Sequence, residues 1–185
     1  MEYSCITRDT DALIGESFSD YSPPSWDVYF LRLSYEVATK SRDPSTKFGA
    51  VVVKDKRPIL FGYNGLPSNV KDLPERLARP AKYKWTIHSE ANALICGAKF
   101  GISTNKATLY IAGMPCAGCA TMIVAAGISK VVIHRPTALI FSLVSPYGED
   151  DVITTTMFDE AGIEVVFVEE PVNKIAYLGG KKYNV

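Results

Sequence analysis

The chain has 185 residues, of which 47% are hydrophobic and 22% are charged, and its 20 basic residues balance its 20 acidic ones. A chain of this length and ordinary composition can bury about 70% of its unfolded surface, which predicts one compact domain and excludes a largely disordered or collagen-like chain. The formal charge of zero argues against a nucleic-acid polymer as partner, because such partners require many phosphate contacts.

Neither a membrane span nor a secretion signal is predicted. The apolar stretch 138–144 is far too short to cross a bilayer. Residues 1–21 are polar and acidic, lack the apolar core of a signal peptide, and are expected to form a loose N-terminal arm. We therefore expect a cytoplasmic protein with no membrane partner. In that reducing compartment, a close pair among its four cysteines would serve metal binding or redox chemistry rather than a disulfide.

Hydrophobic periodicity divides the chain into helices and strands. Helices are indicated by apolar residues three and four positions apart, such as Trp26, Phe30, Leu33 and Val37, and strands by β-branched runs. In chain order, the patterns predict a helix over 26–37, strands over 49–53 and 59–62 joined by a turn, a polar connection over 63–87, a helix over 89–99, a strand over 108–111, a helix over 116–126, a strand over 130–134, a helix over 150–161 and a strand over 163–168.

This order predicts an α/β sandwich, with one sheet and helices on both of its faces. Strands that are joined through a helix run parallel, whereas the first hairpin is antiparallel, so the sheet is expected to be mixed. We assign a catalytic domain to 22–170 and a C-terminal tail to 171–185. The connection 63–87 is unusually long for a compact domain and is therefore expected to be functional.

Histidine and cysteine are rare here, with 2 and 4 residues, and three of them gather at the starts of two predicted helices. Cys116 and Cys119 begin one helix three positions apart, so both sulfurs can point the same way, and His88 precedes another helix. The partial positive charge of a helix N-terminus favours a thiolate. Two cysteines and one histidine suit Zn²⁺ and leave its fourth tetrahedral position open to water, as in catalytic zinc sites.

Glu90 lies two residues from His88, close to the predicted metal but free to stay outside its ligand shell. A carboxylate there can take a proton from a zinc-activated water and return it to a leaving group. Taken alone, Cys116 and Cys119 could instead form a redox pair, but that reading leaves His88 and Glu90 unexplained. The remaining histidine and cysteines are too scattered to form a second metal site: Cys5, Cys96 and His134.

The pattern H-x-E…P-C-x-x-C is the signature of zinc deaminases of nucleobases, and the chain resembles the cytidine and deoxycytidylate (dCMP) deaminase superfamily from about residue 26 to 168. Further stretches resemble dCMP deaminases in particular: 43–53, the G-Y-N-G turn at 62–67, 125–132 and 159–164. The resemblance implies a three-layer cytidine-deaminase-like fold with a mixed five-stranded sheet, one zinc ion per chain and a homo-oligomer. The implied reaction is hydrolytic loss of ammonia from a small nucleotide, with dCMP and water giving dUMP.

Substrate contacts are expected from two parts of the chain. Asn64 resembles the family asparagine that bonds the sugar hydroxyl, although an Asn-Gly pair is also an ordinary hairpin turn. Ser45 and Lys47, together with cations of the connection, could bind a phosphate, or the cations could form a solvated face. These cations are Lys71, Arg76, Arg79, Lys82 and Lys84.

Two positions depart from the family pattern. The residue between the histidine and the glutamate is usually alanine and is Ser89 here. Many dCMP deaminases have a tyrosine in the loop after the strand equivalent to 130–134, whereas the loop 135–141 has none and the nearest is Tyr147. Because pocket shape selects the base, a deaminase of guanine or adenine type stays open as an alternative, as does a non-catalytic binding protein of the same fold.

Overall fold

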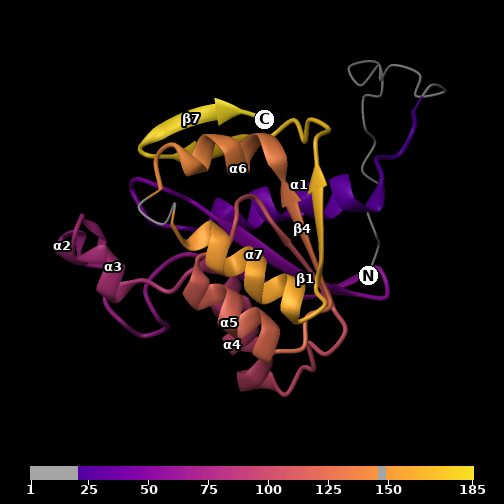
Figure 1. Ribbon diagram of the computed structural model, residues 1–185. Coiled ribbons are helices and arrows are strands. Elements are labelled where there is room, and N and C mark those ends of the chain that lie inside the picture. The colour runs from indigo at the N-terminus through magenta and orange to yellow at the C-terminus, as the bar shows by residue number, and fades with distance from the viewer. Residues whose placement is uncertain (1–20, 146–148) are drawn as a thin grey trace, which may run out of the picture.

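The computed structural model describes residues 21–145 and 149–185 (Figure 1). The predicted N-terminal arm lies outside the described residues except for its last residue, and Cys5 and Tyr147 lie outside them too. Among the helices that the structure describes, none is long and apolar enough to cross a membrane.

A five-stranded mixed sheet in the order β2-β1-β3-β4-β5 forms the centre of the fold. β1 runs antiparallel to both β2 and β3, whereas β3, β4 and β5 run parallel to one another. This arrangement confirms the predicted sheet. The strands are β1 (Gly49–Lys54), β2 (Arg57–Tyr63), β3 (Thr108–Ile111), β4 (Lys130–His134) and β5 (Glu164–Val168).

Helices cover both faces of this sheet, which gives the three expected layers (Figure 1). Because side chains alternate along a strand, Ala50 and Val52 of β1 join one apolar cluster while Val51 and Val53 join the other. The first cluster packs against α4 (Ser89–Phe100), α5 (Ala117–Ala125) and α7 (Asp150–Glu160), and the second packs against α1 (Trp26–Ala38).

Residues 135–141, expected to be a loop, instead belong to the helix α6 (Arg135–Ser142). Its second residue is Pro136, and the fixed φ of proline suits the first turn of a helix. The expectation of a loop was wrong here because a short segment led by a proline can equally form a turn or a loop. The polar connection 63–87 also contains two short helices, α2 (Pro74–Leu77) and α3 (Lys82–Trp85).

The segment 171–185, assigned above as a C-terminal tail, contains an antiparallel hairpin of β6 (Ile175–Leu178) and β7 (Lys181–Asn184). Leu178 is fully buried in the same apolar cluster as α1. The hairpin also bonds the segment that precedes β1. The N–H of Lys47 donates to the carbonyl of Tyr177 at 2.9 Å, and the N–H of Gly180 donates to the carbonyl of Ser45 at 2.7 Å.

His134 is a fully buried core residue at the end of β4 and does not belong to the described group of metal ligands. Its Nδ1 lies 2.8 Å from the hydroxyl of Tyr35 and 2.9 Å from that of Thr137, and its Nε2 lies 3.2 Å from the carbonyl of Glu170. Burial lowers the pKa of His134 below its usual value. The neutral ring thereby ties α1, β4 and α6 together through hydrogen bonds.

The absence of a side chain at Gly62 lets α4 approach β2 closely. A Cβ at Gly62 would lie 2.1 Å from the carbonyl oxygen of Ser89 and 2.4 Å from the backbone nitrogen of Ala93. Backbone atoms cannot yield as a flexible side-chain tip can. The position of the first half of α4, which carries Glu90, therefore depends on this glycine.

Gly62→Ala is expected to destabilise the protein by about 1–3 kcal/mol or more, because the added methyl group must displace backbone. Gly118→Ala is the matched control. A Cβ at Gly118 meets nothing within 4 Å, and alanine is favoured over glycine inside a helix by up to about 1 kcal/mol. Urea unfolding measures both variants. A Gly62→Ala protein as stable as the wild type would refute the close approach.

Candidate active site

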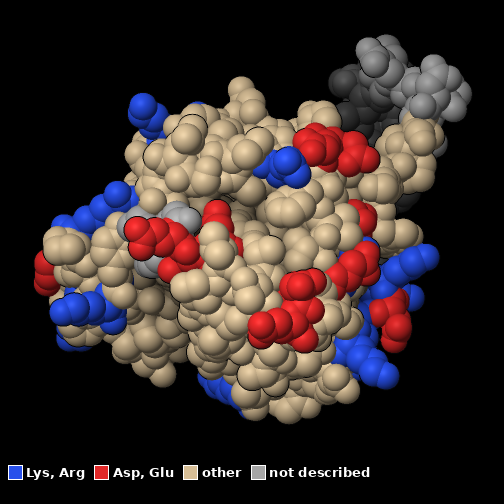
Figure 2. All heavy atoms as spheres, viewed as in Figure 1, with Lys and Arg blue, Asp and Glu red and all other residues tan. Residues whose placement is uncertain are grey.

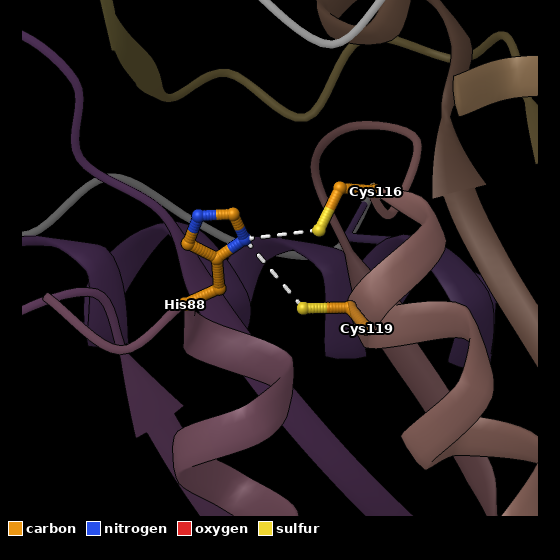
Figure 3. A group of neighbouring side chains, drawn as sticks. All are labelled: His88, Cys116 and Cys119. Carbon is orange, nitrogen blue, oxygen red and sulfur yellow. Dashed lines mark hydrogen bonds between the residues drawn. The ribbon is translucent and has the colours of Figure 1, made fainter. Parts of the chain in front are cut away.

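The structure brings the three predicted metal ligands together at the N-termini of two helices (Figure 3). His88 is the N-cap residue of α4, Cys116 is the N-cap residue of α5, and Cys119 follows in the first turn of α5. Nδ1 of His88 lies 3.3 Å from Sγ of Cys116 and 3.5 Å from Sγ of Cys119. The imidazole and both sulfurs therefore face one point between the helices.

The geometry of this group fits a zinc ion. Zinc bonds of about 2.0–2.1 Å to nitrogen and about 2.3 Å to sulfur, at a tetrahedral angle, place the two donor atoms about 3.6 Å apart. The observed nitrogen–sulfur distances are close to that value, and all three donor atoms lie within 4.8 Å of one another. One nitrogen and two sulfurs leave one corner of the tetrahedron open.

The two thiols of this group differ in their acidity. Hydrogen bonding with Cys119, reinforced by His88, lowers the pKa of Cys116 to about 4. The same hydrogen bond and burial raise the pKa of Cys119, so Cys116 ionises first. The bond to Cys116 also raises the pKa of His88, although burial opposes it. A dication at the centre would favour the thiolate form of both cysteines.

Glu90, the predicted proton carrier, lies buried in the first turn of α4 and lines the same pocket as His88 and Cys116. Its Oε2 accepts a hydrogen bond of 2.7 Å from the hydroxyl of Ser89. Ser89 is itself buried, so water does not compete for this bond. The serine that replaces the usual alanine thus provides a donor that orients the carboxylate of Glu90.

A pocket of about 730 Å³, counting the solvent in its open mouth, adjoins these residues. Phe48 and Phe141 form an apolar wall, with ring centroids 4.7 Å apart at an interplanar angle of 90°. A Cβ at Gly113 would lie 3.1 Å from the ring of Phe48, so the absence of a side chain at Gly113 lets this ring occupy its position.

The expected substrate residues lie at different depths. Asn64 lines the pocket, and its amide accepts from the N–H of Phe48 and donates to the carbonyl of Thr46, each at 2.8 Å. Ser45 and Lys47 are not part of the described lining: the hydroxyl of Ser45 accepts a bond of 2.6 Å from Lys82, and Nζ of Lys47 donates to the carbonyl of Ser41. The side chain of Asn64 therefore holds the 46–48 segment in place.

Two of the five cations in the connection 63–87, Arg79 and Lys82, line the pocket. Lys82 is buried, and its Nζ lies 2.6 Å from Oδ2 of Asp43. Burial alone would raise the pKa of Asp43, but bonds from Lys82 and from the backbone N–H groups of Thr46 and Ser45 lower it. No role for Asp43 was predicted, because no local pattern reveals a buried ion pair between residues 39 positions apart.

On the face shown in Figure 2, the described Lys and Arg side chains lie in separate groups interrupted by acidic ones. A polymer of phosphates is best matched by a continuous basic band. This face therefore offers no such band among the residues that the structure describes.

Comparison with known proteins identifies the family. The family described as the cytidine and deoxycytidylate deaminase zinc-binding region matches residues 24–135, a segment that contains His88, Glu90, Cys116 and Cys119. Deoxycytidylate deaminase of Mycobacterium phage D29 is 39% identical over 128 residues, which cover 62% of this chain and 98% of that protein. The human deoxycytidylate deaminase is 30% identical over 171 residues, which cover 88% of this chain and 83% of that protein.

Solved structures show the same fold. The dCMP deaminase of cyanophage S-TIM5 in its apo form has a TM-score of 0.59 at 22% identity, over 80% of this chain and 100% of that chain. The same enzyme in complex with dCMP and dUMP has a TM-score of 0.57 at 24% identity, with the same coverage. The chain therefore belongs to the cytidine and deoxycytidylate deaminase family, and the predicted class of hydrolytic nucleotide deaminase is confirmed.

Protein purified without chelator is expected to contain about one zinc ion per chain by elemental analysis, because the three donor atoms of the described ligand group surround one point and suit a single tetrahedral cation. Cys116→Ser and Cys119→Ser should each lose most of this metal. Cys96→Ser is the matched control, since Cys96 lies outside the group and should keep the full content. Full zinc content in Cys119→Ser would show that the ligand set is wrong.

Proposed function

We propose that the chain catalyses the hydrolytic deamination of dCMP to dUMP and ammonia. The observation that carries this proposal is one pocket lined both by the carboxylate of Glu90 beside the His88–Cys116 pair and by the cations Arg79 and Lys82. The carboxylate and the metal-binding pair suit hydrolysis at an amine-bearing ring carbon, and the two cations suit a monophosphate. Relatives that are named deoxycytidylate deaminases support the choice of substrate.

We assign His88, Cys116 and Cys119 as the ligands of one zinc ion. When bound, zinc lowers the pKa of a coordinated water to about 7 and so supplies a nucleophile at neutral pH. The two thiolates offset the charge of the dication, while a neutral imidazole keeps the centre less anionic than three thiolates would. The helix N-termini that carry the ligands stabilise the thiolates further.

Glu90 is the proposed proton carrier. Its carboxylate takes a proton from the attacking water and delivers it to N3 of cytosine, which makes C4 electrophilic. As the C4–oxygen bond forms, the ring nitrogen accepts the displaced electron pair. Glu90 then passes the second water proton to the amino group, the C4–nitrogen bond breaks, and ammonia leaves. The hydrogen bond from Ser89 keeps the carboxylate aimed at these positions.

The remaining pocket residues are proposed to bind the nucleotide. Phe48 and Phe141 offer apolar surface to the base or sugar, and Arg79 and Lys82 offer donors to the phosphate. Ser45 would support binding through its bond to Lys82, and Lys47 and Asn64 would support it by holding the neighbouring backbone. A homo-oligomer located in the cytoplasm stays an expectation from the family resemblance.

Glu90→Gln is expected to keep the fold and the metal, because Glu90 is not a ligand, but to lose about 10²–10⁴-fold in kcat. Ammonia release from dCMP measures the rate, and elemental analysis measures the metal. Exposed Glu75→Gln, a carboxylate outside the described pocket lining, should retain the wild-type rate. Wild-type turnover by Glu90→Gln would remove Glu90 from the mechanism.

A substrate panel tests the proposed reaction. Ammonia release should be fastest with dCMP among the bases, nucleosides and monophosphates of cytosine, adenine and guanine. Arg79→Ala should raise KM for dCMP by about tenfold or more, because a charge-assisted bond is lost, and leave deoxycytidine little affected. Lys84→Ala, an exposed cation outside the described pocket lining, is the control. Preference for a purine nucleotide would overturn the choice of cytosine, and equal kcat/KM for deoxycytidine and dCMP would overturn the monophosphate.

A further inference from the structure

The first turns of α7 contact the loop that carries Cys116, although α7 provides none of the described metal-ligand group. Oδ2 of Asp150 accepts a hydrogen bond of 2.9 Å from the N–H of Ala117, and the hydroxyl of Thr154 donates one of 3.0 Å to the carbonyl of Pro115. The two bonds flank Cys116 on either side and join residues 33 and 39 positions apart in the chain. α7 lies beside α5 over the sheet (Figure 1).

Asp150 supplies the hydrogen-bond acceptor that the N-cap residue of α5 does not provide. The first N–H groups of a helix have no partner within the helix, and an oxygen-bearing N-cap side chain usually accepts one of these bonds. At α5 the N-cap residue is Cys116, which makes no side-chain capping bond and turns its sulfur toward His88 and Cys119. The carboxylate of Asp150 accepts from the N–H of Ala117 instead, so a distant helix caps α5.

The hydroxyl of Thr154 bonds outside its own helix, unlike those of the two threonines that follow it. The hydroxyls of Thr155 and Thr156 donate to carbonyls one turn back in α7, those of Asp151 and Val152, as helical threonines commonly do. Thr154 is fully buried and reaches across to Pro115. Its bond fixes the carbonyl immediately before Cys116 in a place where water cannot substitute for it.

From these contacts we propose that Asp150 and Thr154 are positioning residues that hold the Cys116 loop in its metal-binding conformation. The inference rests on the proposed zinc site. The two bonds restrain the backbone before and after Cys116, so the sulfur is held near its ligand position whether or not a cation is present. The affinity for zinc is then partly set by α7, from outside the ligand shell.

Competition for Zn²⁺ against a chromogenic chelator tests the proposal on the full chain. Thr154→Val removes the hydroxyl and keeps the shape, and Asp150→Ala removes the acceptor; each should lower zinc affinity about 10–100-fold. Thr154→Ser and Asp150→Asn retain a donor and an acceptor and should recover most of that loss. Thr155→Val, exposed and bonded only within α7, is the matched control and should bind like the wild type.

Two further measurements separate positioning from general destabilisation. Thermal unfolding of the zinc-free variants shows whether each is folded at the assay temperature, and if Thr154→Val is not, the Asp150→Ala and Asp150→Asn pair decides. The Co²⁺-loaded proteins report ligand geometry through their thiolate-to-metal absorption, which should change in Asp150→Ala and return in Asp150→Asn.

Wild-type affinity and Co²⁺ spectra in both Thr154→Val and Asp150→Ala would overturn the inference. An equal loss of affinity in Thr155→Val would overturn it as well, because the effect would then not depend on the contacts with the loop. A wild-type chain that binds neither Zn²⁺ nor Co²⁺ would instead refute the metal centre of the proposed function. The two failures are therefore distinguishable.

Discussion

The meeting of two helix N-termini, those of α4 and α5, is the constraint on which the rest of the active site depends. Each N-terminus brings partial positive charge and N–H groups without a partner inside the helix to the same place, which favours anionic side chains there. Cys116 and Cys119 lie at this end of α5 and Glu90 lies at this end of α4, where the partial positive charge stabilises their anionic forms. The sheet makes the meeting possible, because β2 lets α4 approach at Gly62 and β3 leads directly to the cysteine loop.

The parts that the sequence predicts well are those with local signals. α4 has apolar residues at helical spacing and ends at Gly101, which takes the left-handed conformation that glycine permits. The group of His88, Cys116 and Cys119 and the neighbouring Glu90 were predicted because the two short patterns, taken together, point to one chemistry. The hairpin β6–β7 was missed because four-residue strands joined by two glycines show too little alternation to stand out. Lys82 could be counted as a cation, but its burial depends on Asp43, which lies far away in the sequence.

Residues in a recognisable motif also shape the pocket through bonds to other atoms of the protein. Ser45 and Asn64 lie in stretches that resemble the family, yet their side chains bond Lys82 and the backbone of 46–48. The apolar wall is completed by Phe141, from a helix where a loop was expected. The described lining of this pocket thus comes from five stretches of the chain, namely 43–48, 64, 79–90, 111–116 and 141, and hydrogen bonds join the first three through Asp43 and Lys82.

The bonds between the C-terminal hairpin and the segment before β1 have a consequence for the order in which the protein matures. Gly179 donates to the hydroxyl of Thr46 at 3.3 Å across 133 residues, beside the bonds of Ser45 and Lys47 to the same hairpin. A nascent chain contains every proposed zinc ligand, Glu90 and both positioning residues of α7 once residue 154 has been made. The segment 45–47 beside the pocket, however, cannot form its hydrogen bonds to the C-terminal hairpin until residue 180 has left the ribosome. Because a domain generally folds as a unit, we expect the substrate pocket to be complete only after the C-terminal hairpin has been made, later than the last residue of the proposed metal site.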